Sequence, residues 1–129
     1  MTRDFVATAS DGSTHLPSAD KPHPRAYGTF PRKIRYALDE KVLSLEAAIR
    51  SCSGLPAEIL GLSDRGTIRV GSYADLIVFD PKTFRDAATF DNPTQYAPGL
   101  LYVFVNGVTE VEKGVFRGKL AGRVLRKKP

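Results

Sequence analysis

The hydrophobic pattern changes from a helical period to a period of two at residues 62–80, which read LSDRGTIRVGSYADLIVFD. This pattern predicts a strand over 67–70, a turn over 71–73 and a second, stronger strand over 75–80. Apolar residues alternate with polar ones or form a short continuous run here, and glycines punctuate the stretch. We therefore expect a β-rich part of the chain to begin at about residue 61.

The sequence after residue 80 continues the β pattern. A strand is predicted over 102–105, and Asn106-Gly107 is a strong hairpin signal because both residues tolerate positive φ. The pattern continues with a strand over 108–112, a turn at Lys113-Gly114 and a last strand over 115–116. Residues 61–129 are accordingly predicted as one mainly β domain.

The sequence before residue 61 reads as α/β. Residues 5–10 predict a short buried strand that ends at the turn signal Asp11-Gly12. Residues 12–31 hold four prolines and predict a long loop, which in a compact domain is typically functional or disordered. Helices are predicted over 32–41, over 45–53 with Ser44 as cap and Gly54 as stop, and from Pro56 to about Leu60.

The composition is that of an ordinary globular domain. The 129 residues are 42% hydrophobic and 26% charged, which excludes a collagen-like, disordered or coiled-coil chain. A compact protein of this mass exposes roughly 6,700 Å². The longest apolar runs have six residues, and the first residues lack the apolar core of a signal peptide, so we expect a cytoplasmic protein with no membrane span.

The single cysteine, Cys52, excludes an intrachain disulfide and a cysteine-only zinc site built from this chain. It shares one predicted helix face with Leu45, Ala48 and Ile49, so we expect it to pack in the core.

The net charge of +5 is concentrated at one end. Residues 113–129 carry seven basic groups and no acidic ones, whereas the other 112 residues carry 12 basic and 14 acidic groups. A basic strip of this kind binds nucleic acid weakly or simply solvates the terminus. Phe116 is the single aromatic residue among these charges, too few for a row of stacking platforms, so we expect no specific nucleic-acid partner.

Four residues of metal-ligand type cluster near the predicted loop: Asp11, His15, Asp20 and His23. Their spacing matches no compact zinc pattern. Asp11 stands at the end of a predicted buried strand, where barrel enzymes place catalytic groups, although an aspartate there also caps a turn. Arg25 follows His23-Pro24 on a stiffened loop, and it is either a surface arginine or a carboxylate-binding one.

Several motifs together resemble the end of an N-acyl-D-amino-acid deacylase (D-aminoacylase) of the metal-dependent amidohydrolase superfamily. Residues 62–80 follow the superfamily's closing pattern, in which G-x-I-x-x-G-x-x-A-D-L-x-x-x-D runs from Gly66 to Asp80. The loop HPRAYGTFPR at 23–32 narrows the resemblance to the D-acyl branch. Further matching stretches are Ser10-Asp11-Gly12, 43–50, 90–94, 105–108 and 122–126.

The resemblance implies a fold in which residues 1–60 are the last strand, substrate loop and helices of an α/β-barrel. Residues 61–129 would then be the C-terminal part of a small β-sandwich. The family uses zinc to activate a water molecule that attacks the amide carbonyl of an N-acyl-D-amino acid. Its zinc ligands lie on earlier barrel strands, which this sequence does not contain.

The resemblance also implies residue roles. Asp11 matches the family's general base and acid, which lies next to the metal, and Arg25 matches the arginine that holds the substrate carboxylate. His23 belongs to the same substrate loop. We expect the 129-residue chain alone to be inactive. Two alternatives are a subunit of a split deacylase, completed by a partner chain, and a non-catalytic β-domain interaction module, which could self-associate.

Overall fold

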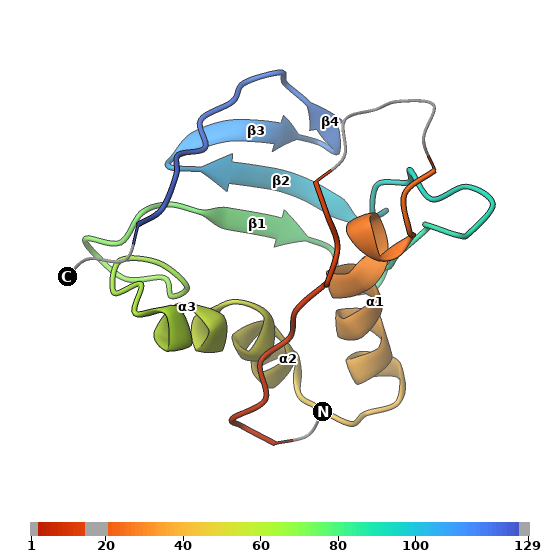
Figure 1. Ribbon diagram of the computed structural model, residues 1–129, viewed down its shortest axis with the longest axis horizontal. Coiled ribbons are helices and arrows are strands. Elements are labelled where there is room, and N and C mark those ends of the chain that lie inside the picture. Colours follow the sequence, from red (N-terminus) through yellow and green to blue (C-terminus); the bar gives the residue numbers. More distant parts are fainter. Residues whose placement is uncertain (1–2, 15–20, 127–129) are drawn as a thin grey trace.

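The computed structural model describes residues 3–14 and 21–126, in which three helices precede a four-stranded antiparallel sheet. The sheet lies above the helices, and the N-terminal segment crosses in front of them (Figure 1). The elements are α1 (Arg25–Asp39), α2 (Leu45–Cys52), α3 (Gly54–Leu60), β1 (Leu76–Phe79), β2 (Leu100–Val105), β3 (Val108–Glu112) and β4 (Val115–Phe116).

The sheet is a meander in the order β1-β2-β3-β4. Asn106 and Gly107 join β2 to β3 with φ angles of 49° and 82°, which confirms the predicted hairpin turn. Lys113 and Gly114 repeat this arrangement between β3 and β4. The predicted strands over 75–80, 108–112 and 115–116 are confirmed, and β2 begins at Leu100, two residues before the prediction.

The helix α2 begins and ends close to its predicted bounds. The Ser44 hydroxyl accepts a hydrogen bond from the backbone N–H of Ala47 at 3.2 Å, so the predicted cap is confirmed. Hydrogen bonds from its own backbone N–H and from the Ser44 hydroxyl lower the pKa of Glu46. The predicted end of this helix is confirmed to within one residue, because α2 ends at Cys52 with Ser53 as its C-cap and Gly54 follows at the predicted C′ position. Gly54 is also the first residue of α3.

The helix α1 begins at Arg25, although residues 12–31 were predicted to be a loop. Pro31 inside a helical stretch argued for a loop, because proline removes a backbone donor. The surroundings outweigh this cost. The first turn is fixed by hydrogen bonds from Tyr27 and Gly28 to the carbonyl of Pro24, and Gly28 lies so close to Asp86 that a Cβ would approach its side chain to 3.1 Å.

Two predicted strands are absent from the described residues. Phe5 lies in a turn and residues 6–10 form no regular element. Among the described residues, their one backbone hydrogen bond to another element runs from Thr8 N to the carbonyl of Ser51, at 2.8 Å. Residues 67–70 are irregular, and Ile68 and Val70 are fully or almost fully exposed. Both predictions were wrong for the same reason: a strand needs a neighbouring strand, and neither segment has one in the described part of the chain.

The core is small. The buried apolar side chains lie mainly between the helices and the loop after β1, and no large side chain of the described residues is fully buried. The described residues also contain no helix that is long and apolar enough to cross a membrane. The buried apolar residues are Ile34, Ala37, Ala48, Leu55, Ala57, Phe84 and Ala88.

Candidate functional site

Asp11 lies at the end of the extended segment, beside the first turn of α1. Its φ of 50° is in the left-handed region, which aspartate tolerates better than most residues. Gly12 follows because the chain passes very close to α1: a Cβ there would lie 3.0 Å from the Cα of Ala26. This close approach holds the Asp11 carboxylate next to the start of the helix.

His23 directly precedes Pro24, the N-cap residue of α1. Its Nδ1 accepts a hydrogen bond from the backbone N–H of Arg25 at 3.0 Å, and its carbonyl accepts one from Ala26. The imidazole ring also packs edge-on against Phe90, with ring centroids 5.0 Å apart.

Arg25 and Asp11 form an ion pair, with Arg25 Nη1 2.9 Å from Asp11 Oδ2. The structure therefore brings together the two residues that the resemblance connects to substrate and to proton transfer. The Asp11 side chain is 86% exposed and that of Arg25 is 44% exposed. Exposed pairs of this kind contribute only about 0–1 kcal/mol, so an incoming carboxylate can replace Asp11 on the guanidinium.

A cavity of about 290 Å³ is lined by one member of this pair, Arg25. Besides Arg25 it contains a second guanidinium, that of Arg32, which donates to Asp86 Oδ2 from Nε at 2.9 Å. The hydrogen bond and the charge of Asp86 raise the pKa of Arg32. The positive charge of Arg32 is therefore balanced by Asp86. The cavity is lined by His23, Pro24, Arg25, Gly28, Thr29, Arg32, Ala88, Thr89 and Phe90.

The described residues do not fit a zinc ion by themselves. They contain no group of three or more histidine, cysteine, aspartate or glutamate side chains that could hold a metal. Asp11 is paired with Arg25 and His23 caps a helix, while His15 and Asp20 lie outside the described residues. A metal near Asp11 would need ligands from elsewhere.

Cys52 is half-buried at the end of α2, and its thiol is free. The Sγ atom lies 3.9 Å from the hydroxyl of Ser51, and the side chain faces the large hollow between helices and sheet. This position is partly consistent with the predicted role in packing, although the side chain is not fully covered.

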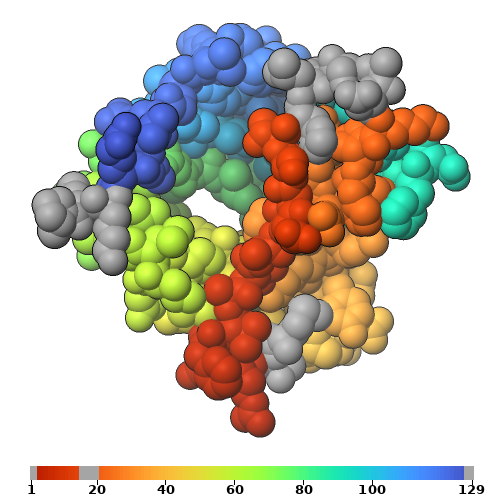
Figure 2. Space-filling view, in the orientation of Figure 1, coloured from red at the N-terminus to blue at the C-terminus, as the bar shows by residue number. Residues whose placement is uncertain are grey.

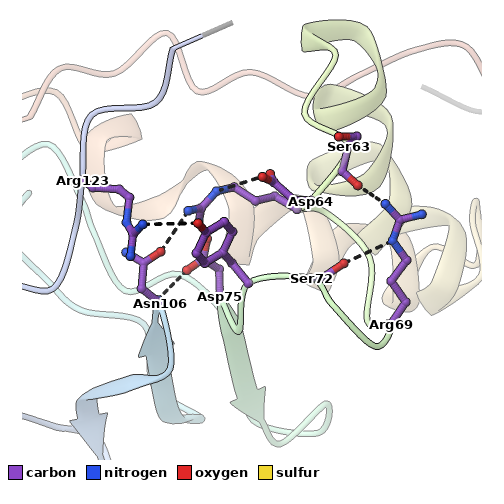
Figure 3. Close-up of polar contacts among 9 residues, drawn as sticks. Ser63, Asp64, Arg69, Ser72, Asp75, Asn106 and Arg123 are labelled. Atoms are coloured by element: carbon purple, nitrogen blue, oxygen red, sulfur yellow. Dashed lines mark hydrogen bonds and ion pairs between the residues drawn. The ribbon is translucent and has the colours of Figure 1, made fainter. Parts of the chain in front are cut away.

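The sequence prediction missed a polar cluster around Arg65, which joins the start of β1 to the β2–β3 turn (Figure 3). The Arg65 side chain is only 9% exposed; its guanidinium pairs with Asp75 and donates to Asn106 Oδ1 at 2.9 Å. It also stacks on Tyr73, 4.3 Å from the ring centroid, and Arg123 approaches the same ring at 4.8 Å.

Asn106 extends this cluster to the C-terminal segment. Its backbone N–H donates to Asp75 Oδ1 and its amide donates to the carbonyl of Ala121, both at 2.7 Å. The Asp75 carboxylate therefore has a structural role. Its place in the A-D-L motif was visible in the sequence, but its partners were not.

Comparison with known proteins gives a consistent result. Residues 2–111 match the family model described as "Amidohydrolase family". The D-aminoacylase of Alcaligenes xylosoxydans xylosoxydans is 47% identical over 115 residues, which are 88% of this chain and 24% of the relative. A crystal structure of D-aminoacylase superposes with a TM-score of 0.82 at 46% identity, over 92% of this chain and 24% of that one.

A second solved structure is the N-acyl-D-glutamate deacylase of Bordetella bronchiseptica, in complex with zinc and a phosphonate inhibitor. It is 38% identical and superposes with a TM-score of 0.75, over 84% of this chain and 22% of that one. The chain thus spans about a quarter of the length of the relatives it matches.

Proposed function

The chain belongs to the amidohydrolase family, and we propose that it supplies Asp11 and Arg25 to the active site of a zinc-dependent N-acyl-D-amino-acid deacylase. The observation that carries this proposal is the ion pair between these two residues, of which Arg25 lines a cavity. The identity of 47% to a D-aminoacylase supports the same activity and substrate class. A purely structural β module has no comparable support.

We further propose that residues 1–60 are the end of a barrel and residues 61–129 part of a β-sandwich. The support is the strand-like sequence of 5–10 and 67–70, which are extended or irregular because each lacks a neighbouring strand. In a complete barrel, 5–10 would gain neighbours on both edges. Asp11 would then stand at the carboxyl end of a barrel strand, where such enzymes carry their chemistry.

Arg25 is the proposed anchor for the carboxylate of the substrate. A guanidinium binds a carboxylate through two parallel hydrogen bonds. Arg25 is the cavity arginine whose carboxylate partner, Asp11, is largely exposed, whereas Arg32 is bound to the more buried Asp86. The substrate carboxylate would displace Asp11 from Arg25. Substrate binding at Arg25 therefore releases Asp11.

Asp11 is the proposed general base and acid. Water adds to the amide carbonyl and loses a proton to Asp11, the C–N bond breaks, and the proton passes to the leaving amine. The products are a carboxylate and a D-amino acid. Zinc, when bound, polarises the carbonyl and the water, but its ligands have to come from outside the described residues of this chain.

The direct test is to build a hybrid enzyme, which we call the exchange protein. In the D-aminoacylase of A. xylosoxydans xylosoxydans, the quarter that matches this chain is replaced by this chain, and amino-acid release is measured from N-acetyl-D-leucine and N-acetyl-D-glutamate. The two L enantiomers are the controls. We expect release from at least one D substrate and none from the L forms. A folded, zinc-loaded exchange protein that leaves both D substrates intact would overturn the proposal.

A further inference from the structure

Lys33 occupies a core position of α1. It lies on the buried face of the helix with Ile34 and Ala37, and it is only 8% exposed. Its ammonium donates a hydrogen bond to the Thr8 hydroxyl at 2.5 Å, and it forms no ion pair with any residue that the structure describes. A buried ammonium is costly to desolvate, and charges at core positions are found mainly at functional sites. This lysine therefore calls for an explanation other than packing.

A chain of hydrogen bonds connects Lys33 to α2. The Ser51 hydroxyl donates its single proton to the carbonyl of Ala48 at 2.7 Å. The contact of 3.4 Å between the hydroxyls of Thr8 and Ser51 is therefore donated by Thr8, whose oxygen accepts from Lys33. The Thr8 backbone N–H also donates to the carbonyl of Ser51, at 2.8 Å. Thr8 is thus held by both helices, by α1 through Lys33 and by α2 through Ser51.

Thr8 belongs to the N-terminal segment, which lies across the helices and is coloured red in Figure 2. Residues 6, 8 and 10 are half-buried, whereas residues 5, 7 and 9 are exposed. This period of two places every second side chain against the helices. Thr8 is on the covered face, where its hydroxyl meets the buried ammonium.

Two contacts set the register of this segment along α1. Lys33 holds Thr8 beside the middle of the helix, and Arg25 pairs with Asp11 at its start. The helix rises about 12 Å from Arg25 to Lys33, and a strand-like chain spans about 10 Å from Thr8 to Asp11. The two lengths match, so one register satisfies both contacts. Lys33 thereby determines which residue of the segment meets Arg25.

We propose that Lys33 is a positioning residue: through Thr8 it holds the segment in register on α1 and so keeps the Asp11 carboxylate in place for proton transfer. This rests on the proposed function. A general base has to lie within hydrogen-bond reach of the proton that it takes up. A shift of about 1 Å in the segment would therefore slow the reaction, while Arg25 would still bind the substrate carboxylate.

The kinetic test is Lys33→Met in the exchange protein, which removes the charge and keeps an unbranched side chain. We expect kcat to fall at least about tenfold, with KM and zinc content within about twofold of the unsubstituted protein. Lys119→Met, at an exposed lysine, is the matched control and should change neither constant. An unchanged kcat in Lys33→Met, with or without a lower melting temperature, would overturn the proposal, because a purely structural lysine acts on folding alone.

Two substitutions of Thr8 test the route and serve also if Lys33→Met does not fold. Thr8→Ser keeps the hydroxyl and should retain kcat, whereas Thr8→Val leaves the ammonium without this acceptor and should lower kcat at least about tenfold. In the double variant with Lys33→Met and Thr8→Val the two losses should not multiply, because both act on one contact. Equal kcat in Thr8→Ser and Thr8→Val would overturn the route through Thr8.

Amide hydrogen exchange of the full 129-residue chain separates this proposal from the proposed function. The Thr8 amide should exchange at least about fivefold faster in Lys33→Met and at the normal rate in Lys119→Met, because its bond to Ser51 depends on the segment staying in place. An unchanged rate in Lys33→Met would overturn the proposal. A faster rate, together with an exchange protein that hydrolyses no D substrate, would contradict the proposed function and still support the anchoring by Lys33.

Discussion

Arg25 Nη1 lies 2.9 Å from Asp11 Oδ2, so the proposed substrate anchor and the proposed base neutralise each other in this structure. The two residues are 14 positions apart, and they meet because Gly12 lets the chain pass next to the first turn of α1. A substrate carboxylate on Arg25 would free Asp11 for proton transfer. Substrate binding at Arg25 is thereby coupled to the release of Asp11, so substitutions of the two residues should have different kinetic effects.

Asp11→Asn in the exchange protein should lower kcat by about 10²–10⁴-fold, since an amide cannot take up the proton of the attacking water. Zinc content and folding should be almost unchanged. Turnover is measured with the D substrates, and metal by elemental analysis. Asp91→Asn, at an exposed aspartate, is the control. Near-normal turnover in Asp11→Asn would contradict the role of Asp11.

Arg25→Met should act mainly on KM. Loss of hydrogen bonds to a charged group costs about 1.5–3 kcal/mol, which corresponds to a rise in KM of about 10–100-fold. Arg25→Lys keeps the charge but loses the two-pronged geometry, so its KM should lie between those of the wild type and Arg25→Met. Steady-state kinetics measure KM for both variants. An unchanged KM in Arg25→Met would mean that the substrate carboxylate binds elsewhere.

Arg65→Met should destabilise the chain by about 2 kcal/mol, because Asp75 and Asn106 each lose their contact with a nearly buried guanidinium. Arg123 contacts the same tyrosine ring but is exposed, so Arg123→Met should lower the free energy of unfolding by well under about 1 kcal/mol. Urea unfolding of both variants measures the difference. Equal losses would mean that the Arg65 cluster does not organise the start of β1.

Asp80 makes stability depend on pH. Hydrogen bonds from the Lys82 backbone and the Thr83 hydroxyl lower the pKa of Asp80 from its ordinary value of 3.8. Because the folded pKa is the lower one, the stabilisation is present above about pH 4 and is lost as the pH falls through the folded pKa. The urea midpoint of Asp80→Asn should therefore change less between about pH 5 and about pH 3 than that of the wild type. Asp91→Asn should behave like the wild type.

Gly99 and Gly118 form a matched pair for stability. Both have positive φ, 82° and 70°, but a Cβ at Gly99 would lie 2.5 Å from the backbone nitrogen of Phe84, whereas Gly118 faces open space. Gly118→Ala should lower the free energy of unfolding by about 1 kcal/mol, from backbone strain alone. Gly99→Ala should cost at least about 2 kcal/mol more, because backbone has to move. Similar losses in urea unfolding would contradict the close approach.

The second half of the fold was predictable because its signals are local. The turns at Asn106-Gly107 and Lys113-Gly114 set both the position and the pairing of β3, and both adopt the positive φ angles that such turns require. The Ser44 cap is local in the same way. None of these features depends on a distant part of the chain.

The errors have non-local causes. The segments 5–10 and 67–70 have strand-like sequences, but strand formation depends on a neighbour that sequence periodicity does not reveal. The helix α1 begins before its predicted start and includes Pro31; its first turn is held by hydrogen bonds to the Pro24 carbonyl, and Arg32 pairs with the distant Asp86. Similarly, Asp11 and Arg25 could be chosen from the resemblance, but their contact depends on how the chain folds back.

The most direct test of the central claim is to capture the polypeptide that carries this segment from the cells that make it, with an antibody against residues 21–60. Its mass and its hydrolysis of N-acetyl-D-amino acids are then measured together. The account predicts that the segment is found in a chain or complex several times heavier than 14.1 kDa, with activity on a D substrate and not on its L form. A single species of 14.1 kDa with no deacylase activity would contradict it.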